Sequence, residues 1–298
     1  MILAVTGGTG FVGRHLLRLA VEAGHGVRAL ARSPQSPQPG VTWVAGTLAS
    51  PADLCTGADV VIHIAGVINA RSRAEFDAGN VAGTASVLAA AKAAGITRFV
   101  HVSSLAAREP QLSAYGASKL ASEALIEASS LDWSIVRPPG VYGPGDRETL
   151  ALFQLAQRGW ALTPWAGRVS MIEVGDLSRA LLALAAAPAT FATHEPDDGT
   201  PVDHATLART IGAAVGRRIR ILRVPAAGMS LAAAIDTAQA ITRGHLPRLS
   251  FDRARYLAHP DWVSRGASLA GLWTPRVGLA EGTAATAAWY RRQGWLPG

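Results

Sequence analysis

The chain has 298 residues, 49% of them apolar, and a formal net charge of +7 at pH 7. This length and apolar content fit one large domain or a domain with a smaller lobe. The arginines are scattered singly, without a basic run or interleaved aromatic residues, so we expect no nucleic-acid partner. Cys55 is the only cysteine, which excludes an internal disulfide and a cysteine metal cluster.

The pattern of apolar residues also limits where the protein acts. The longest apolar stretches, such as Leu181 to Ala187 and Leu231 to Ile235, are far shorter than the ~20 residues that cross a bilayer. A strand-like run begins at Ile2 and leads directly into a glycine-rich loop, which is not the pattern of a signal peptide. We therefore expect a cytoplasmic protein that acts on a small molecule and has no membrane partner.

The first motif is a glycine-rich loop between a predicted strand, Ile2 to Thr6, and a predicted helix, Phe11 to Ala23. Its glycines fit the dinucleotide-binding fingerprint, which needs a tight turn, a close approach of the pyrophosphate and tight packing of helix on strand. The helix N-terminus adds N–H groups and the positive end of a dipole. The predicted cofactor contacts here are Gly7, Gly10, Phe11, Val12 and Gly13.

The end of the second predicted strand, Val27 to Ala31, indicates which dinucleotide binds. An acidic residue at this point would bind the ribose hydroxyls and select NAD. The chain instead continues with Arg32 and Ser33. A guanidinium binds a 2′-phosphate through charge-assisted hydrogen bonds. We therefore expect NADP, with Arg32 as its ligand, while NAD remains possible.

Short apolar runs alternate with longer amphipathic runs up to about residue 140, which predicts a doubly wound parallel sheet of the Rossmann type. After that point turn-rich segments interrupt the alternation. We expect residues 1–140 to form the dinucleotide-binding domain and residues 141–298 mostly a small mixed C-terminal lobe for the substrate, with the last Rossmann elements returning within it. The further strands are predicted at 41–45, 60–65, 99–103 and 133–137, and helices at 74–94, 113–129, 150–158, 176–187 and 205–215.

Three residues in the first domain predict catalysis. Tyr115 and Lys119 are four apart on a predicted helix, so both side chains can reach one cleft. The ammonium group would lower the pKa of the phenol, and the pair could move a proton to or from a substrate oxygen. Ser104 follows a predicted strand, where it could donate a hydrogen bond to that oxygen or simply cap the next segment.

These motifs together resemble the extended short-chain dehydrogenase/reductases, in the epimerase/dehydratase branch. The resemblance covers nearly the whole chain. The matching segments are Thr6-Gly7-x-x-Gly10-x-x-Gly13, His63-x-Ala65-Gly66, Asn80-x-x-Gly83-Thr84, Ser103-Ser104, Tyr115-x-x-x-Lys119 and Arg137-Pro138-Pro139-Gly140-Val141-Tyr142-Gly143-Pro144-Gly145.

The resemblance implies a role for each matching position. Tyr115 is expected as general acid/base, Ser104 polarises the substrate oxygen, and Lys119 also holds the nicotinamide ribose. Ala65 and Gly66 let the cofactor lie close to the sheet, Asn80 braces the helix below the site, and Pro139, Gly140 and Val141 border the nicotinamide. A homodimer through the helices at 74–94 and 113–129 is also implied.

The expected function is an NADP(H)-dependent oxidoreductase or epimerase that transfers hydride to or from a carbon bearing a hydroxyl or carbonyl. Two alternatives remain open. The hydride could return to the same substrate, or the chain could bind NADPH without turnover. Because the segment between Ser104 and Tyr115 is short, a small or moderately apolar substrate is favoured over a sugar nucleotide. No metal site is expected, since His63 and His101 lie on predicted strands as packed, hydrogen-bonded residues.

Overall fold

The computed structural model describes residues 1–244, 247, 249–267 and 269–297. The chain forms two compact units. The first comprises Met1–Pro138, Gly175–Pro196 and Arg265–Thr274, and the second comprises Pro139–Val174, Asp197–Ser264 and Pro275–Gly298. The chain first passes from one unit to the other between Pro138 and Pro139, close to the predicted boundary, and then returns to the first unit twice.

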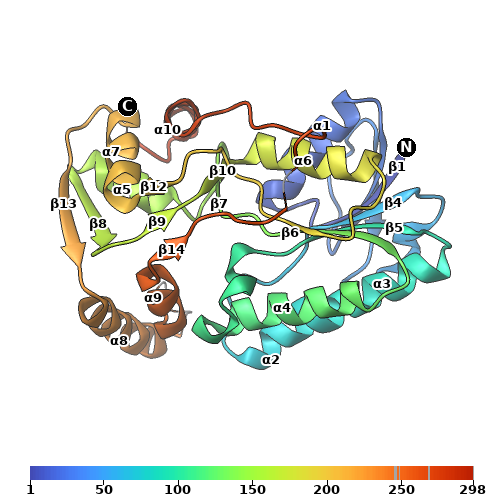
Figure 1. Cartoon of the computed structure of the whole chain (residues 1–298), viewed down its shortest axis with the longest axis horizontal. Coiled ribbons are helices and arrows are strands. Elements are labelled where there is room, and N and C mark those ends of the chain that lie inside the picture. Colours follow the sequence, from blue (N-terminus) through green and yellow to red (C-terminus); the bar gives the residue numbers. More distant parts are fainter. Residues whose placement is uncertain (245–246, 248, 268, 298) are drawn as a thin grey trace. The chain divides into compact units, whose positions relative to one another are not determined.

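A parallel sheet of seven strands forms the centre of the first unit (Figure 1). All its strand pairs are parallel, in the order β11-β6-β5-β4-β1-β2-β3. The central strand β1 is an unbroken apolar run whose Leu3, Ala4 and Val5 are fully buried, as expected for a strand covered on both faces. The strands are β1 (Ile2–Thr6), β2 (Gly26–Ala31), β3 (Val41–Ala45), β4 (Val60–His63), β5 (Arg98–Val102), β6 (Asp132–Val136) and β11 (Thr193–His194).

Helices cover both faces of this sheet. Figure 1 shows α2 (Arg73–Phe76), α3 (Gly83–Ala93) and α4 (Ala114–Glu127) on one face. On the other face lie α1 (Phe11–Glu22) and α6 (Val174–Ala186). The doubly wound parallel fold predicted from the alternating pattern is therefore confirmed. The predicted bounds of the first six strands and of α1 and α4 hold to within about two residues.

One predicted helix has a more complex structure. The segment expected as a single helix over residues 74–94 divides into α2, a π-helical turn η2 (Asp77–Ala82) and α3. Asn80 lies in the π-helical turn and is 1% exposed. Such turns re-aim a side chain out of the regular helical ladder, and they are frequent at functional sites.

The second unit is a mixed lobe. Its helices α5 (Leu150–Gln157), α7 (His204–Ala214) and α10 (Leu279–Arg292) share one apolar core that includes Phe153, Ile211 and Tyr290. Its other helices, α8 (Ala226–Arg243) and α9 (Phe251–Ala258), pack around Met229, Ala233 and Ala254. Its short strands are β7 (Gly140–Tyr142), β8 (Trp160–Pro164), β9 (Arg168–Val169), β10 (Met171–Glu173), β12 (Val202–Asp203), β13 (Arg220–Val224) and β14 (Asp261–Trp262). In the described part of the chain, no helix combines the length and apolar character needed to cross a bilayer.

Candidate cofactor and active site

The order of the strands determines where a ligand can bind in the first unit. From β1 the chain adds β2 and β3 on one side, and then continues with β4 on the other side of β1. Loops leaving the carboxyl ends of β1 and β4 therefore diverge, and such a switch point is where open α/β sheets bind ligands. The residues that follow are Gly7 after β1 and Ala65 after β4.

The loop after β1 is closed by its glycines. Gly7 has φ +74°, a conformation that favours glycine, and a Cβ there would lie 2.8 Å from the Ala65 nitrogen. The Gly7 carbonyl accepts a hydrogen bond from the Gly10 N–H at 2.9 Å. A Cβ on Gly13 would lie only 2.0 Å from that carbonyl oxygen. These positions therefore require glycine, and they bring Gly7, Gly10 and Gly13 together as predicted.

The first turn of α1 fits a pyrophosphate. Its N-cap residue, Gly10, has no side chain to accept from the first-turn N–H groups, and the turn contains no acidic residue. Phe11 and Val12 begin this helix and are partly buried. The free N–H groups and the helix dipole together suit a dinucleotide phosphate.

A chain of hydrogen bonds holds the loop after β4. Thr84 Oγ1 donates to the Asn80 carbonyl at 2.6 Å, so it accepts from His63 Nε2 at 3.0 Å. Thr6 Oγ1 in turn donates to His63 Nδ1 at 2.6 Å and accepts from the Ala65 N–H at 3.1 Å. Burial, with a smaller effect of the charge on Lys119, lowers the pKa of His63 to about 3, so the ring stays neutral and this pattern is stable.

Asn80 connects the same loop to α4. Its Oδ1 accepts from the Val67 N–H at 2.6 Å, and its Nδ2 donates to the Val67 carbonyl at 3.0 Å and to Ser118 Oγ at 2.8 Å. A Cβ on Gly66 would lie 2.9 Å from Asn80 Oδ1 and 3.8 Å from Lys119 Nζ. The structure thus places Ala65 and Gly66 between the glycine loop and α4.

Ser104 and Tyr115 lie side by side. Their side chains are hydrogen-bonded, and the Ser104 hydroxyl also accepts from the Ala106 N–H at 3.2 Å. Ser104 therefore caps the 3-10 turn η3 (Leu105–Arg108) through its oxygen, while its proton is directed to Tyr115. The helix α4 packs closely on η3, since a Cβ on Gly116 would lie 2.5 Å from the Ala106 carbonyl oxygen. This packing holds Tyr115 beside Ser104.

The titration of Tyr115 and Lys119 depends on burial. Burial raises the pKa of Tyr115, and the hydrogen bond from Ser104 lowers it by a smaller amount. The helical spacing predicted that Lys119 lowers the pKa of the phenol, whereas burial raises that pKa and the phenol is protonated at neutral pH. Burial also lowers the pKa of Lys119 to about 8, with Glu123 raising it, so the ammonium is charged at pH 7. Its Nζ donates to the Val102 carbonyl at 2.8 Å.

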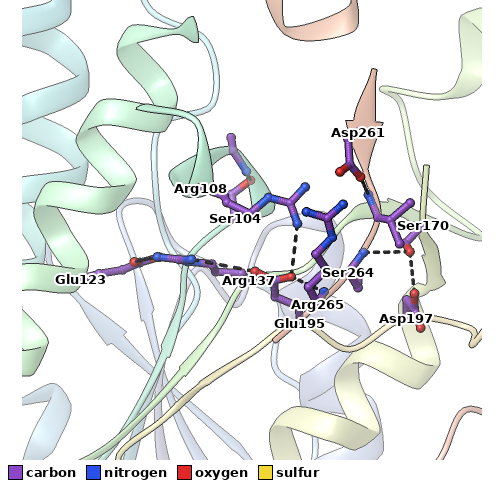
Figure 2. Close-up of polar contacts among 12 residues, drawn as sticks. Ser104, Arg108, Glu123, Arg137, Ser170, Glu195, Asp197, Asp261, Ser264 and Arg265 are labelled. Atoms are coloured by element: carbon purple, nitrogen blue, oxygen red, sulfur yellow. Dashed lines mark hydrogen bonds and ion pairs between the residues drawn. The ribbon is translucent and has the colours of Figure 1, made fainter. Parts of the chain in front are cut away.

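A buried ionic network supports the Ser103–Ser104 segment (Figure 2). Ser103 Oγ donates to Glu123. Arg137 binds the same carboxylate through Nε at 2.9 Å and Nη2 at 2.5 Å. Glu195 lies 3.8 Å from Arg137 Nη1 and 3.6 Å from Arg108 Nη1. The network holds the end of β5, and with it Ser104, in the first unit.

Sequence reasoning missed Glu123 and Glu195. Glu123 had a usable signal, because it follows Lys119 by one helical turn and so shares the face that carries Tyr115. Glu195 had none, since it directly follows the short strand β11, and only the sheet brings it near Arg137.

The remaining predicted residues lie elsewhere. Arg32 follows β2, is exposed and makes no ion pair with any residue that the structure describes. Gly140 and Val141 form part of β7 in the second unit, beside β10, and Pro139 precedes them. Their contact with nicotinamide stays a prediction.

His63 and His101 are fully buried, and each is hydrogen-bonded through Nε2 to a hydroxyl. Among the described residues no group of three or more His, Cys, Asp or Glu could hold a metal ion.

Comparisons with known proteins agree with this geometry. The family model described as NAD(P)H-binding matches residues 7–184, more than half of the chain. The chain belongs to the extended short-chain dehydrogenase/reductase family. It is similar to a ceramide reductase of Caulobacter vibrioides, with 39% identity over 99% of this chain and 96% of the relative.

Two further comparisons cover different lengths. The 4-hydroxy-2-methyl-3-oxo-4-farnesyl-3,4-dihydroquinoline-1-oxide ketoreductase of Stigmatella aurantiaca is 38% identical over 48% of this chain and 51% of its own length. The crystal structure of gox2253 has a TM-score of 0.79 at 19% identity and covers 99% of each chain, which shows the same fold. The chain is thus an NAD(P)-dependent oxidoreductase or epimerase, as the motifs predicted.

Proposed function

We propose that this enzyme uses NADPH to reduce a ketone on a ceramide-type lipid, with Tyr115 as the proton donor. The observation that carries the proposal is the cluster of Ser104, Tyr115 and Lys119 in the first unit. The Ser104 hydroxyl is hydrogen-bonded to that of Tyr115, and Lys119 is buried one helical turn further along α4.

The protonation state of this cluster suits reduction. Because burial raises the pKa of Tyr115, its hydroxyl carries a proton at neutral pH and can give it to a developing alkoxide. The Ser104 hydroxyl, which donates to Tyr115 in this structure, can donate to the same oxygen once a substrate is bound. The charged Lys119 stabilises the phenolate left behind and, through its ammonium group, can hold the cofactor ribose. When bound, the cofactor supplies the hydride.

The choice of NADPH rests on the end of β2. Arg32 is exposed there, pairs with no carboxylate of the described residues, and is followed by Ser33. A 2′-phosphate would find an available guanidinium at this point, whereas NADH would meet no acid to bind its ribose hydroxyls. We infer a preference for NADPH on this ground.

The substrate class rests on two observations. The segment between Ser104 and Tyr115 forms only two short 3-10 turns, η3 and η4 (Pro110–Leu112), and Leu105, Ala106 and Ala107 in the first are buried. It therefore adds no long wall of the kind that a sugar nucleotide needs. A relative that matches along 96% of its own length is a ceramide reductase, and another, matched along 51% of its length, is a ketoreductase. On a lipid of this class, the group that accepts the hydride is a ketone in the lipid chain.

The test compares turnover with cofactor binding. NADPH oxidation is followed with the keto form of a ceramide, and in parallel with UDP-glucose, for the parent and for Tyr115→Phe. We expect the parent to reduce the lipid only, and Tyr115→Phe to lose ~10²–10⁴-fold in rate with unchanged NADPH binding. The control is Tyr256→Phe, the same change on α9 of the second unit, which should keep full activity.

Each part of the proposal can fail separately. Parental rates in Tyr115→Phe would show that another group moves the proton. Turnover of the sugar nucleotide without turnover of the lipid would refute the substrate class. Tighter binding of NADH than NADPH would refute the cofactor assignment.

A further inference from the structure

The two-stranded sheet of β8 and β13 in the second unit has one covered and one open face. Helices α5 and α7 pack against β8, and Thr163 of that strand is buried. Side chains alternate along a strand, so Trp160 and Leu162 lie on the opposite face. They are 45% and 54% exposed, and Leu222, which pairs with Leu162 across the sheet, is 54% exposed. We call these three residues the open face.

The helix α8 directly follows β13 (Figure 1) and carries further exposed apolar residues. Val224 at the end of β13 packs against the cluster of Met229 and Ala233, so α8 adjoins the sheet. The helix also carries Leu231 and Ile235, one turn apart, and they are 64% and 52% exposed. Exposed large apolar side chains gathered on neighbouring elements of one unit favour a site of interaction.

Basic residues outnumber acidic ones in the segments that build this surface; the acid that α8 carries, Asp236, is partly buried and accepts from the Leu249 N–H at 2.8 Å. Residues 149–172 and 204–235 contain no Asp or Glu. They do contain seven arginines: Arg158, Arg168, Arg209, Arg217, Arg218, Arg220 and Arg223. Four of these, Arg217, Arg218, Arg220 and Arg223, are exposed and lie on β13 or just before it. The guanidinium of Arg220 lies 5.6 Å from the centroid of the Trp160 ring, so positive charge directly borders the open face.

We propose that the open face and the exposed side of α8 dock onto an anionic phospholipid membrane. Tryptophan and leucine side chains at an interface insert into the boundary between headgroups and acyl chains. The flanking arginines meet the negative headgroups, and each contributes roughly five-fold in binding near such a surface. The complementary charge selects a membrane over a neutral or basic protein partner.

The proposal departs from the prediction that no membrane partner exists. That prediction was based on the length of apolar runs, which bears on segments that span a bilayer and not on surfaces that lie on one. The proposal is also independent of the proposed function, since docking requires neither turnover nor a particular substrate.

The experiment is co-sedimentation of the intact protein with vesicles. Vesicles of phosphatidylcholine alone are compared with vesicles that also contain phosphatidylglycerol. We expect binding only to the second kind, and we expect added salt to weaken it. Arg218→Gln/Arg220→Gln, which removes the charges on the same side of β13 as Leu222, should lower the partition coefficient roughly 25-fold. The control Arg71→Gln/Arg292→Gln removes the same charge from exposed sites elsewhere and should bind like the parent.

The same assay tests the contribution of the exposed apolar side chains to vesicle binding. Leu162→Ser/Leu222→Ser and Leu231→Ser/Ile235→Ser should each lower binding at least ten-fold. Leu152→Ser, an exposed leucine on α5, should not. NADPH titration verifies that every variant is folded. Equal binding to both kinds of vesicle, or variants that bind like their controls, would overturn the proposal. So would variants that keep vesicle binding but dissociate a dimer in analytical ultracentrifugation, since the surface would then join two copies of the chain.

Discussion

Replacing Glu123 by alanine leaves the Arg137 guanidinium without its bidentate partner in the interior of the first unit. In the parent, Arg137 donates to both oxygens of this carboxylate, at 2.9 and 2.5 Å. Glu123 is 1% exposed, so water does not replace it. Ser103 loses its acceptor at the same time.

The loss of stability in Glu123→Ala depends on which contacts Arg137 keeps. Removing one partner of a buried ion pair typically costs about 3–5 kcal/mol, because the other charge stays desolvated and unpaired. Arg137 keeps a second carboxylate, Glu195, whose Oε1 lies 3.8 Å from Arg137 Nη1. This distance is longer than those to Glu123, and it is a single contact instead of a bidentate pair. We therefore expect Glu123→Ala to lower the free energy of unfolding by about 3 kcal/mol, the lower end of the range.

The matched control is the pair of Arg18 and Glu22 on α1. Its Nη1–Oε1 distance is 2.8 Å, but both side chains are more than half exposed. Exposed pairs of this type contribute below about 1 kcal/mol. Urea denaturation followed by circular dichroism measures both variants. If Glu123→Ala and Glu22→Ala lower the unfolding free energy equally, burial does not determine the strength of the network and our reasoning is wrong.

Three more predictions concern the cofactor site. Gly13→Ala should abolish NADPH binding in a fluorescence titration, because its Cβ would meet the Gly7 carbonyl oxygen at 2.0 Å; Gly26→Ala, whose nearest contact is at 3.6 Å, should not. Arg32→Ala should lose roughly ten-fold in NADPH affinity and none in NADH affinity. Burial lowers the pKa of Lys119 from 10.5 to about 8, so between these values the unfolded chain binds more protons than the folded one. The unfolding free energy, measured in urea, should therefore rise with pH across that window relative to Lys119→Met, and a constant difference would exclude the shift.

Local pattern was enough to predict the elements that form the sheet. The first six strands are short apolar runs bounded by turns, and each bound depends on neighbours within a few residues. The glycine loop is equally local, since Gly7, Gly10 and Gly13 contact one another. The spacing of Tyr115 and Lys119 on one helix face is also a property of the chain itself. For these reasons the amino-acid sequence alone determines the fold class, the family and the use of a nicotinamide cofactor.

Contacts between distant segments had to come from the tertiary structure. β8 and β13 pair across a long stretch of sequence, and neither strand alternates clearly enough to be predicted, because the open face is apolar as well. The buried carboxylate of Glu195 meets Arg108 and Arg137 only because β11 joins the edge of the sheet. Whether the pKa of Tyr115 rises or falls depends on how deeply the fold buries the phenol, and spacing along a helix carries no information about burial.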